Sequence, residues 1–189
     1  MVKLLKTDYP KAVSRVAWWY FLTTYSISIG VLDILPDWWG YILLCLALDG
    51  IAAFQPTAKL LRPISLILTA VVTLRTVAHL LGYNKEPYII FAVSAVIYLY
   101  IHFQICTNIS DTVALLGTEQ GSTIALHRDI TTVTYTAGVL AEFFAPVGFV
   151  YYAAVIIHIL SKTVLIFSLW GHSSRRKQVI SRYKTEKTV

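Results

Sequence analysis

Two pairs of ionisable side chains at helical spacing lie inside apolar runs of this sequence. Arg75 and His79 are four residues apart in "TLRTVAHLL", and His158 and Lys162 are four residues apart in "VIIHILSKT". A spacing of four places both members of a pair on one face of an α-helix. Cationic and imidazole groups on one apolar face are suited to binding an anion or carrying a proton near neutral pH.

Three further ionisable residues interrupt other apolar runs, namely Asp49, His102 and Glu142. Ionisable groups in hydrocarbon are costly, so they normally face the interior of a helix bundle and find partners there. Arginine retains its proton in proteins, so Arg75 requires a carboxylate or an anionic ligand. The surroundings of these groups therefore decide what chemistry they can do.

The composition indicates a membrane protein. Apolar residues make up 57% of the 189 residues and charged residues 14%, whereas soluble chains contain about 45–50% and about 25%. The apolar residues form long runs rather than the short alternating segments of a membrane β-barrel. The length predicts a single membrane domain over residues 1–189.

Six segments are long and apolar enough, or nearly so, to cross a bilayer, which takes about 20 helical residues. They are 14–35, 38–56, 62–83, 87–107, 130–145 and 147–170. Turn-forming sequences such as Pro36-Asp37 and "GYNKEP" separate them. The predicted fold class is therefore all-α, a polytopic bundle of six transmembrane helices.

The stretch 108–129 is too polar to cross a membrane, but both of its halves keep a helical apolar spacing. We expect a cytoplasmic helical hairpin that extends the fourth and fifth spans. An amphipathic loop at the membrane interface is the alternative.

The distribution of lysine and arginine predicts the orientation. Thirteen basic residues lie in the N-terminal tail, the second and fourth connections and the C-terminal tail. The connections on the opposite side contain one basic residue, Lys85. Basic residues concentrate on the cytoplasmic side of membrane proteins. We therefore expect a multi-pass protein of the cell membrane with both termini cytoplasmic.

Counting the helical rise along each span arranges the seven ionisable residues in three layers. From the outside inwards the layers are His79 and Glu142, then Asp49, Arg75 and His158, then Lys162 and His102. Because Asp49 and Arg75 share a layer, we expect them to form an ion pair. The seven residues are predicted to line a ligand or ion pathway, and the alternative is a polar clamp that holds helices together.

The first predicted function is a small integral membrane transporter, or the membrane-embedded substrate-binding subunit of one. The cluster of Arg75, His158 and Lys162 suits a small anionic molecule. Six spans are few for a complete carrier, so we expect a homodimer or partner membrane subunits.

A non-catalytic membrane anchor or assembly factor is the alternative function. The basic tail 171–189 contains "SSRRKQVISRYKTEK", which would attract anionic lipid, acidic protein or RNA. The residues predicted to bind such a partner are Arg175, Arg176, Lys177, Arg182 and Lys184. The positive-inside rule by itself also accounts for a basic tail.

An enzyme acting on lipids or membrane peptides is the least favoured function. The sequence contains neither HExxH nor GxSxG, the spacings typical of zinc proteases and of serine hydrolases. Cys45 and Cys106 lie inside apolar runs and are expected to be small buried hydrophobic side chains. We therefore expect no cofactor and no metal site.

Overall fold

The computed structural model of the chain describes residues 8–25, 28–29, 32–33, 37–83, 87–115, 120–144 and 148–186. These ranges contain six α-helices, one 3-10 helix and a pair of two-residue antiparallel strands. The elements are α2 (Tyr9–Thr24), β1 (Ser28–Ile29), β2 (Leu32–Asp33), α3 (Asp37–Ala52), η1 (Pro56–Leu60), α4 (Leu61–Leu80), α5 (Tyr88–Leu115), α6 (Gln120–Phe144) and α7 (Phe149–Glu186). The helical fold class predicted from the sequence is confirmed.

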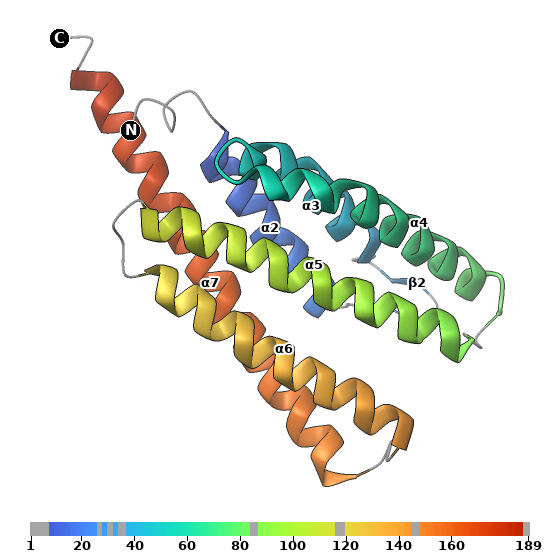
Figure 1. The fold of residues 1–189 in the computed structure, drawn as a ribbon. Helices are drawn as coiled ribbons and strands as arrows, with labels where there is room; N and C mark the ends of the chain where they lie inside the picture. The colour runs from blue at the N-terminus through green and yellow to red at the C-terminus, as the bar shows by residue number, and fades with distance from the viewer. Residues whose placement is uncertain are drawn as a thin grey trace.

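The helices form an elongated up-and-down bundle (Figure 1). Helix α2 packs against α3 and α7, α6 packs against α5 and α7, and α4 packs against α3 and α5. The start of α2 and the end of α7 lie at one end of the bundle, here called the terminal end. The end of α4, the start of α5, the end of α6 and the start of α7 lie at the other end, here called the hairpin end (Figure 1).

Helix α2 begins with Pro10 in its first turn, where proline fits because it lacks the N–H that the first turn cannot use. Asp8 precedes the helix, and the ammonium of Lys11 lies 3.0 Å from its carboxylate. Hydrogen bonding to Lys11 holds the pKa of the Asp8 carboxyl below its usual value.

Helix α2 ends at Thr24, so the prediction of a span over 14–35 is wrong in its second half. Strands β1 and β2 occupy part of the remainder, with Ser28 opposite Asp33. The sequence "SISI" at 26–29 alternates polar and apolar residues, a period of two that favours strand over helix. The span was predicted from apolar content alone, which does not distinguish a helix from an alternating strand.

Three helical segments among the described residues are long and apolar enough to cross a membrane. They are Pro56–Leu80, Tyr88–Leu115 and Tyr151–Arg175. Helices α2 and α3 have 16 residues each, or about 24 Å of rise, which is less than the hydrocarbon thickness of about 30 Å. The three long apolar helices support a membrane protein, as predicted.

The polar stretch 108–129 continues the flanking helices. Helix α5 extends to Leu115 and α6 begins at Gln120, while residues 116–119 lie outside the described ranges. The Ser110 hydroxyl donates a hydrogen bond of 2.8 Å to the backbone oxygen of Gly121. The two helices are thus joined to each other near the terminal end.

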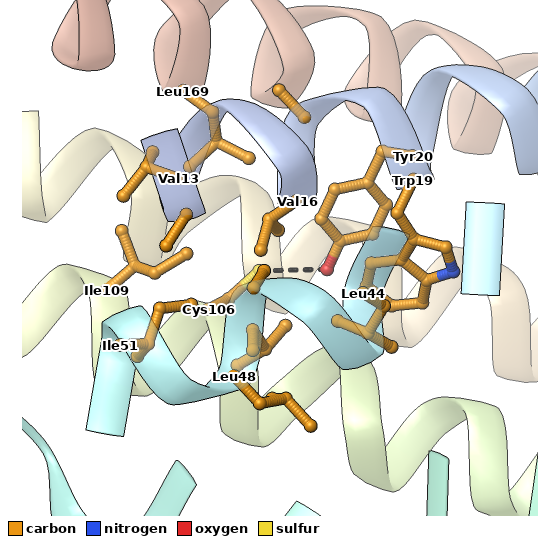
Figure 2. Packing of buried hydrophobic residues seen from close by; sticks show 14 of the residues in the cluster. Val13, Val16, Trp19, Tyr20, Leu44, Leu48, Ile51, Cys106, Ile109 and Leu169 are labelled. Atoms are coloured by element: carbon orange, nitrogen blue, oxygen red, sulfur yellow. Dashed lines mark hydrogen bonds between the residues drawn. The ribbon is translucent and has the colours of Figure 1, made fainter. Parts of the chain in front are cut away.

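The hydrophobic core is centred on α2. Val13 and Val16 of α2 pack with Leu48 of α3, Ile109 of α5 and Leu169 of α7 (Figure 2). Many large apolar side chains on the outer faces of the other helices are exposed, including Leu74, Val96 and Phe167. Apolar outer faces around a buried core suit a helix bundle surrounded by hydrocarbon.

Helices α2 and α3 approach closely at Gly50. A Cβ added at Gly50 would lie 2.6 Å from the Cβ of Ala12, and one added at Gly171 of α7 would meet nothing within 4 Å. The absence of a side chain at Gly50 therefore sets the distance between the two helices.

We expect Gly50→Ala to destabilise the protein by about 1–3 kcal/mol, because an added methyl forces α2 and α3 apart. The matched control is Gly171→Ala, which should be neutral or stabilising because alanine is the better helix former. Thermal unfolding of both purified variants measures the difference. Equal melting temperatures would contradict the close packing.

Candidate functional site

A cleft of about 250 Å³ lies between α2, α5, α6 and α7. Thr23 and Thr24 at the end of α2 line it, so it lies where α6 and α7 continue beyond the shorter helix. The hydroxyl groups of Tyr25 and Thr163 form a hydrogen bond that joins the end of α2 to α7. The early end of α2 thus determines where the cleft lies.

His158 and Lys162 of α7 both line the cleft, as their spacing of four residues requires. Lys162 is buried, with 4% of its surface exposed. Its ammonium lies 5.0 Å from the ring centroid of Tyr98 in a cation–π contact. Lys162 is therefore a buried cation that packs on an aromatic ring.

Several buried polar atoms near this region have no hydrogen-bond partner among the described residues. They are Nδ1 of His158, Oγ1 of Thr24, the Tyr98 hydroxyl and Nε1 of Trp19. A buried polar group without a partner costs about 1–3 kcal/mol. Because His158 and Thr24 line the cleft, a polar molecule bound there would provide partners for them.

Tyrosine rings pack beside the cleft. The Tyr135 ring packs between Tyr98 and His158, with centroid distances of 4.8 and 5.3 Å. Among the described residues, Glu142 of α6 and Lys162 of α7 are the charged side chains that line the cleft, whereas Arg75 is exposed on α4.

The predicted pairing of Asp49 with Arg75 is wrong. Asp49 lies 3.3 Å from Arg62 instead, and both side chains are more than half exposed. Asp49 is one turn before the end of α3, about 5 Å from the terminal end, whereas Arg75 lies about 20 Å along α4. The predicted depths were counted from the outer ends of both spans, but α3 has 16 residues and α4 has 20, so equal depths along the two helices do not correspond to one level.

All seven predicted pathway residues lie within the described ranges. Three of them line the cleft: Glu142, His158 and Lys162. Glu142 is exposed near the hairpin end of α6. His79 is exposed in the last turn of α4 and does not line the cleft. The predicted layers therefore do not form one continuous group.

His102 belongs to a separate buried network. Its Nε2 lies 3.2 Å from the backbone oxygen of Arg128, and a carbonyl only accepts hydrogen bonds, so Nε2 carries the hydrogen. In the neutral ring Nδ1 must then accept, and the Tyr20 hydroxyl donates to it over 2.7 Å. The Cys106 thiol, 3.2 Å away, donates to the Tyr20 oxygen in turn (Figure 2).

This network ties α2, α5 and α6 together, because its members come from all three helices. A second polar contact joins α6 to α7, where the hydroxyls of Thr131 and Ser161 are 2.9 Å apart. The polar groups of both contacts are hydrogen-bonded to each other across the helices. Neither contact lines the cleft. His102 therefore has hydrogen-bond partners within the fold, whereas Glu142, His158 and Lys162 border the cleft.

The predicted partner-binding residues lie on the last part of α7. That part projects past the other helices at the terminal end (Figure 1). Arg175 is exposed. The side chains of Arg176, Lys177, Arg182 and Lys184 lie outside the described part of the chain.

The predicted site residues did not include the tyrosines of the bundle interior. Tyr98, His102 and Cys106 recur at intervals of four residues, which places them on one face of α5. Asp37 was assigned to the turn between the first two predicted spans, but it begins α3. A search for polar residues of every kind at this spacing, rather than for ionisable ones alone, would have found the α5 face.

Comparison of the chain with protein-family models, curated proteins and solved structures finds no match. Within the described ranges, no group of three histidine, cysteine or acidic side chains could hold a metal ion.

We expect Tyr20→Phe to lower the stability by about 1–3 kcal/mol, because His102 and Cys106 lose their shared partner in a buried site. Tyr152→Phe is the matched control, since Tyr152 is 54% exposed and its hydroxyl can bond to water. Differential scanning fluorimetry compares the two variants. A Tyr20 variant as stable as its control would mean that the network contributes nothing to the fold.

Proposed function

We propose that the chain is a small integral membrane transporter, or the membrane-embedded substrate-binding subunit of one, and that its cleft binds a ligand with an anionic group. The observation that carries the proposal is the buried ammonium of Lys162 on the wall of the cleft. A buried charge is expensive and marks a functional site in a membrane protein by default.

The other cleft residues support this assignment. His158 presents an Nδ1 without a hydrogen-bond partner, and Thr24 and Thr134 contribute hydroxyl groups to the lining. The volume of about 250 Å³ is below the range of roughly 300–1,000 Å³ for drug-sized ligands. A small molecule or one lipid headgroup is the size that such a cleft accommodates.

We expect Lys162→Met to abolish the binding of a small carboxylate while the protein remains folded. Butanoate should raise the melting temperature of the parent chain in proportion to its occupancy, and should leave that of the variant unchanged. The variant without ligand should be as stable as the parent or more so, because an apolar side chain replaces a buried cation.

Lys59→Met is the control for a lost positive charge, because Lys59 is exposed in η1. It should respond to butanoate as the parent does. Equal responses of the parent and Lys162→Met would refute the ligand site.

We further propose that all six α-helices lie in the membrane, with both termini cytoplasmic. The three long apolar helices support the membrane location, and the position of the basic residues supports the orientation. Helices α2 and α3 would be accommodated by packing against longer neighbours. A second copy or a partner subunit would complete a carrier of this size.

The orientation predicts opposite labelling of the two ends of the bundle. In a chain with Cys45 and Cys106 replaced by alanine, Lys85→Cys should react with a membrane-impermeant maleimide on intact cells. Gln120→Cys and Ile180→Cys should react only after the cells have been permeabilised. Labelling of positions 120 and 180 from opposite sides would disprove the topology.

An anchor or assembly factor is the second candidate function. The observation in its favour is the end of α7 that projects past the other helices (Figure 1). Its sequence is basic, which would attract anionic lipid, an acidic protein or RNA. Failure of the Lys162 experiment would favour this candidate over the transporter.

A further inference from the structure

We infer that the ligand of the cleft carries an ammonium group as well as an anionic group, the two being about 5 Å apart. This inference rests on the proposed ligand site and identifies its substrate class. Its basis is that the cleft carries opposite charges toward its two ends: Lys162 is buried among α2, α5 and α7, and Glu142 is exposed near the hairpin end.

The two charged side chains lean toward each other. Side chains of an α-helix are tilted toward its N-terminus. Helix α6 runs from the terminal end to the hairpin end and α7 runs back, as the connection between them requires (Figure 1). Glu142 of α6 is therefore tilted toward the terminal end, and Lys162 of α7 toward the hairpin end.

The spacing of the two charges follows approximately from the helix geometry. The Lys162 ammonium lies over the Tyr98 ring, which packs on the Tyr135 ring. Glu142 is seven residues beyond Tyr135, or about 10 Å of rise along α6. With this rise taken as the separation of the two charges, charge-assisted hydrogen bonds of about 2.8 Å at each end leave on the order of 5 Å between the charged groups of a ligand that bridges them.

The charge balance also favours a ligand without net charge. Among the described residues that line the cleft, Lys162 brings one positive charge and Glu142 one negative charge. A simple anion can contact Lys162 but leaves Glu142 without a ligand contact. A ligand with both charges gains a favourable contact at each end.

The chemical class is therefore a short zwitterion whose charges are separated by several bonds. An ω-amino carboxylate of four or five carbons has this form, and so does the phosphoethanolamine group of a phospholipid. An α-amino acid is too short, because its ammonium and carboxylate share one carbon. The shared chemistry is an ammonium at Glu142 and an anionic oxygen group at Lys162.

The test uses the full chain in nanodiscs of phosphatidylglycerol, with affinities taken from melting temperatures over a ligand titration. The probes are glycine, 4-aminobutanoate and 8-aminooctanoate, together with butanoate. We expect 4-aminobutanoate to bind at least tenfold more tightly than butanoate and than both other amino acids. Glu142→Gln should remove this advantage and leave the affinity for butanoate unchanged.

Asp111→Asn is the control for a lost negative charge, because Asp111 is exposed on the part of α5 near the terminal end. It should keep the preference for 4-aminobutanoate. Equal binding of 4-aminobutanoate and butanoate, or a preference that survives Glu142→Gln, would overturn the zwitterion and leave the anion site standing. Binding that persists in Lys162→Met would overturn the proposed function itself.

A second arm separates a free ligand from a lipid. Nanodiscs that contain phosphatidylethanolamine should weaken 4-aminobutanoate binding if the headgroup occupies the cleft, and Glu142→Gln should reduce retention of that lipid in native mass spectrometry. Unchanged binding in both lipids assigns the cleft to a free zwitterion. Absence of probe binding together with Glu142-independent lipid retention would overturn the inference.

Discussion

The packing of α2 is the constraint on which the rest of the structure depends. This helix is buried along most of its length and contacts α3 and α7, with Gly50 allowing α3 to come close to Ala12. Its Tyr20 hydroxyl joins the buried network of His102 and Cys106. Because the helix ends at Thr24, its end also borders the cleft between α5, α6 and α7.

The buried polar groups of the bundle have two different physical roles. Tyr20, His102 and Cys106 bond to one another and to the backbone, so the cost of removing them from water is already offset within the fold. His158 and Lys162 face a space instead, and Nδ1 of His158 has no partner among the described residues. Satisfied groups stabilise a membrane bundle, whereas unsatisfied groups beside a cleft are suited to binding a ligand.

The sequence predicted part of the candidate site. The spacing of His158 and Lys162 placed both on one face of α7, because residues four apart in a helix are neighbours. Asp49 was misplaced, because its level relative to Arg75 depends on the different lengths of α3 and α4 and on how the two helices pack. The contacts of Tyr98 with Tyr135 and Lys162 could not be predicted, since the three residues lie on three different helices and no spacing along the chain links them.

The amino-acid sequence by itself determined that the chain is helical, rich in apolar surface and able to enter a membrane, because these properties follow from composition and from periodicity within one segment. It also determined which side chains share a helix face. The tertiary structure alone decided that Asp49 meets Arg62, that His102 is bonded to Tyr20, and that Glu142, His158 and Lys162 border one cleft. Contacts between helices depend on register, helix length and close approach at glycine, and these emerge only when all the helices pack together.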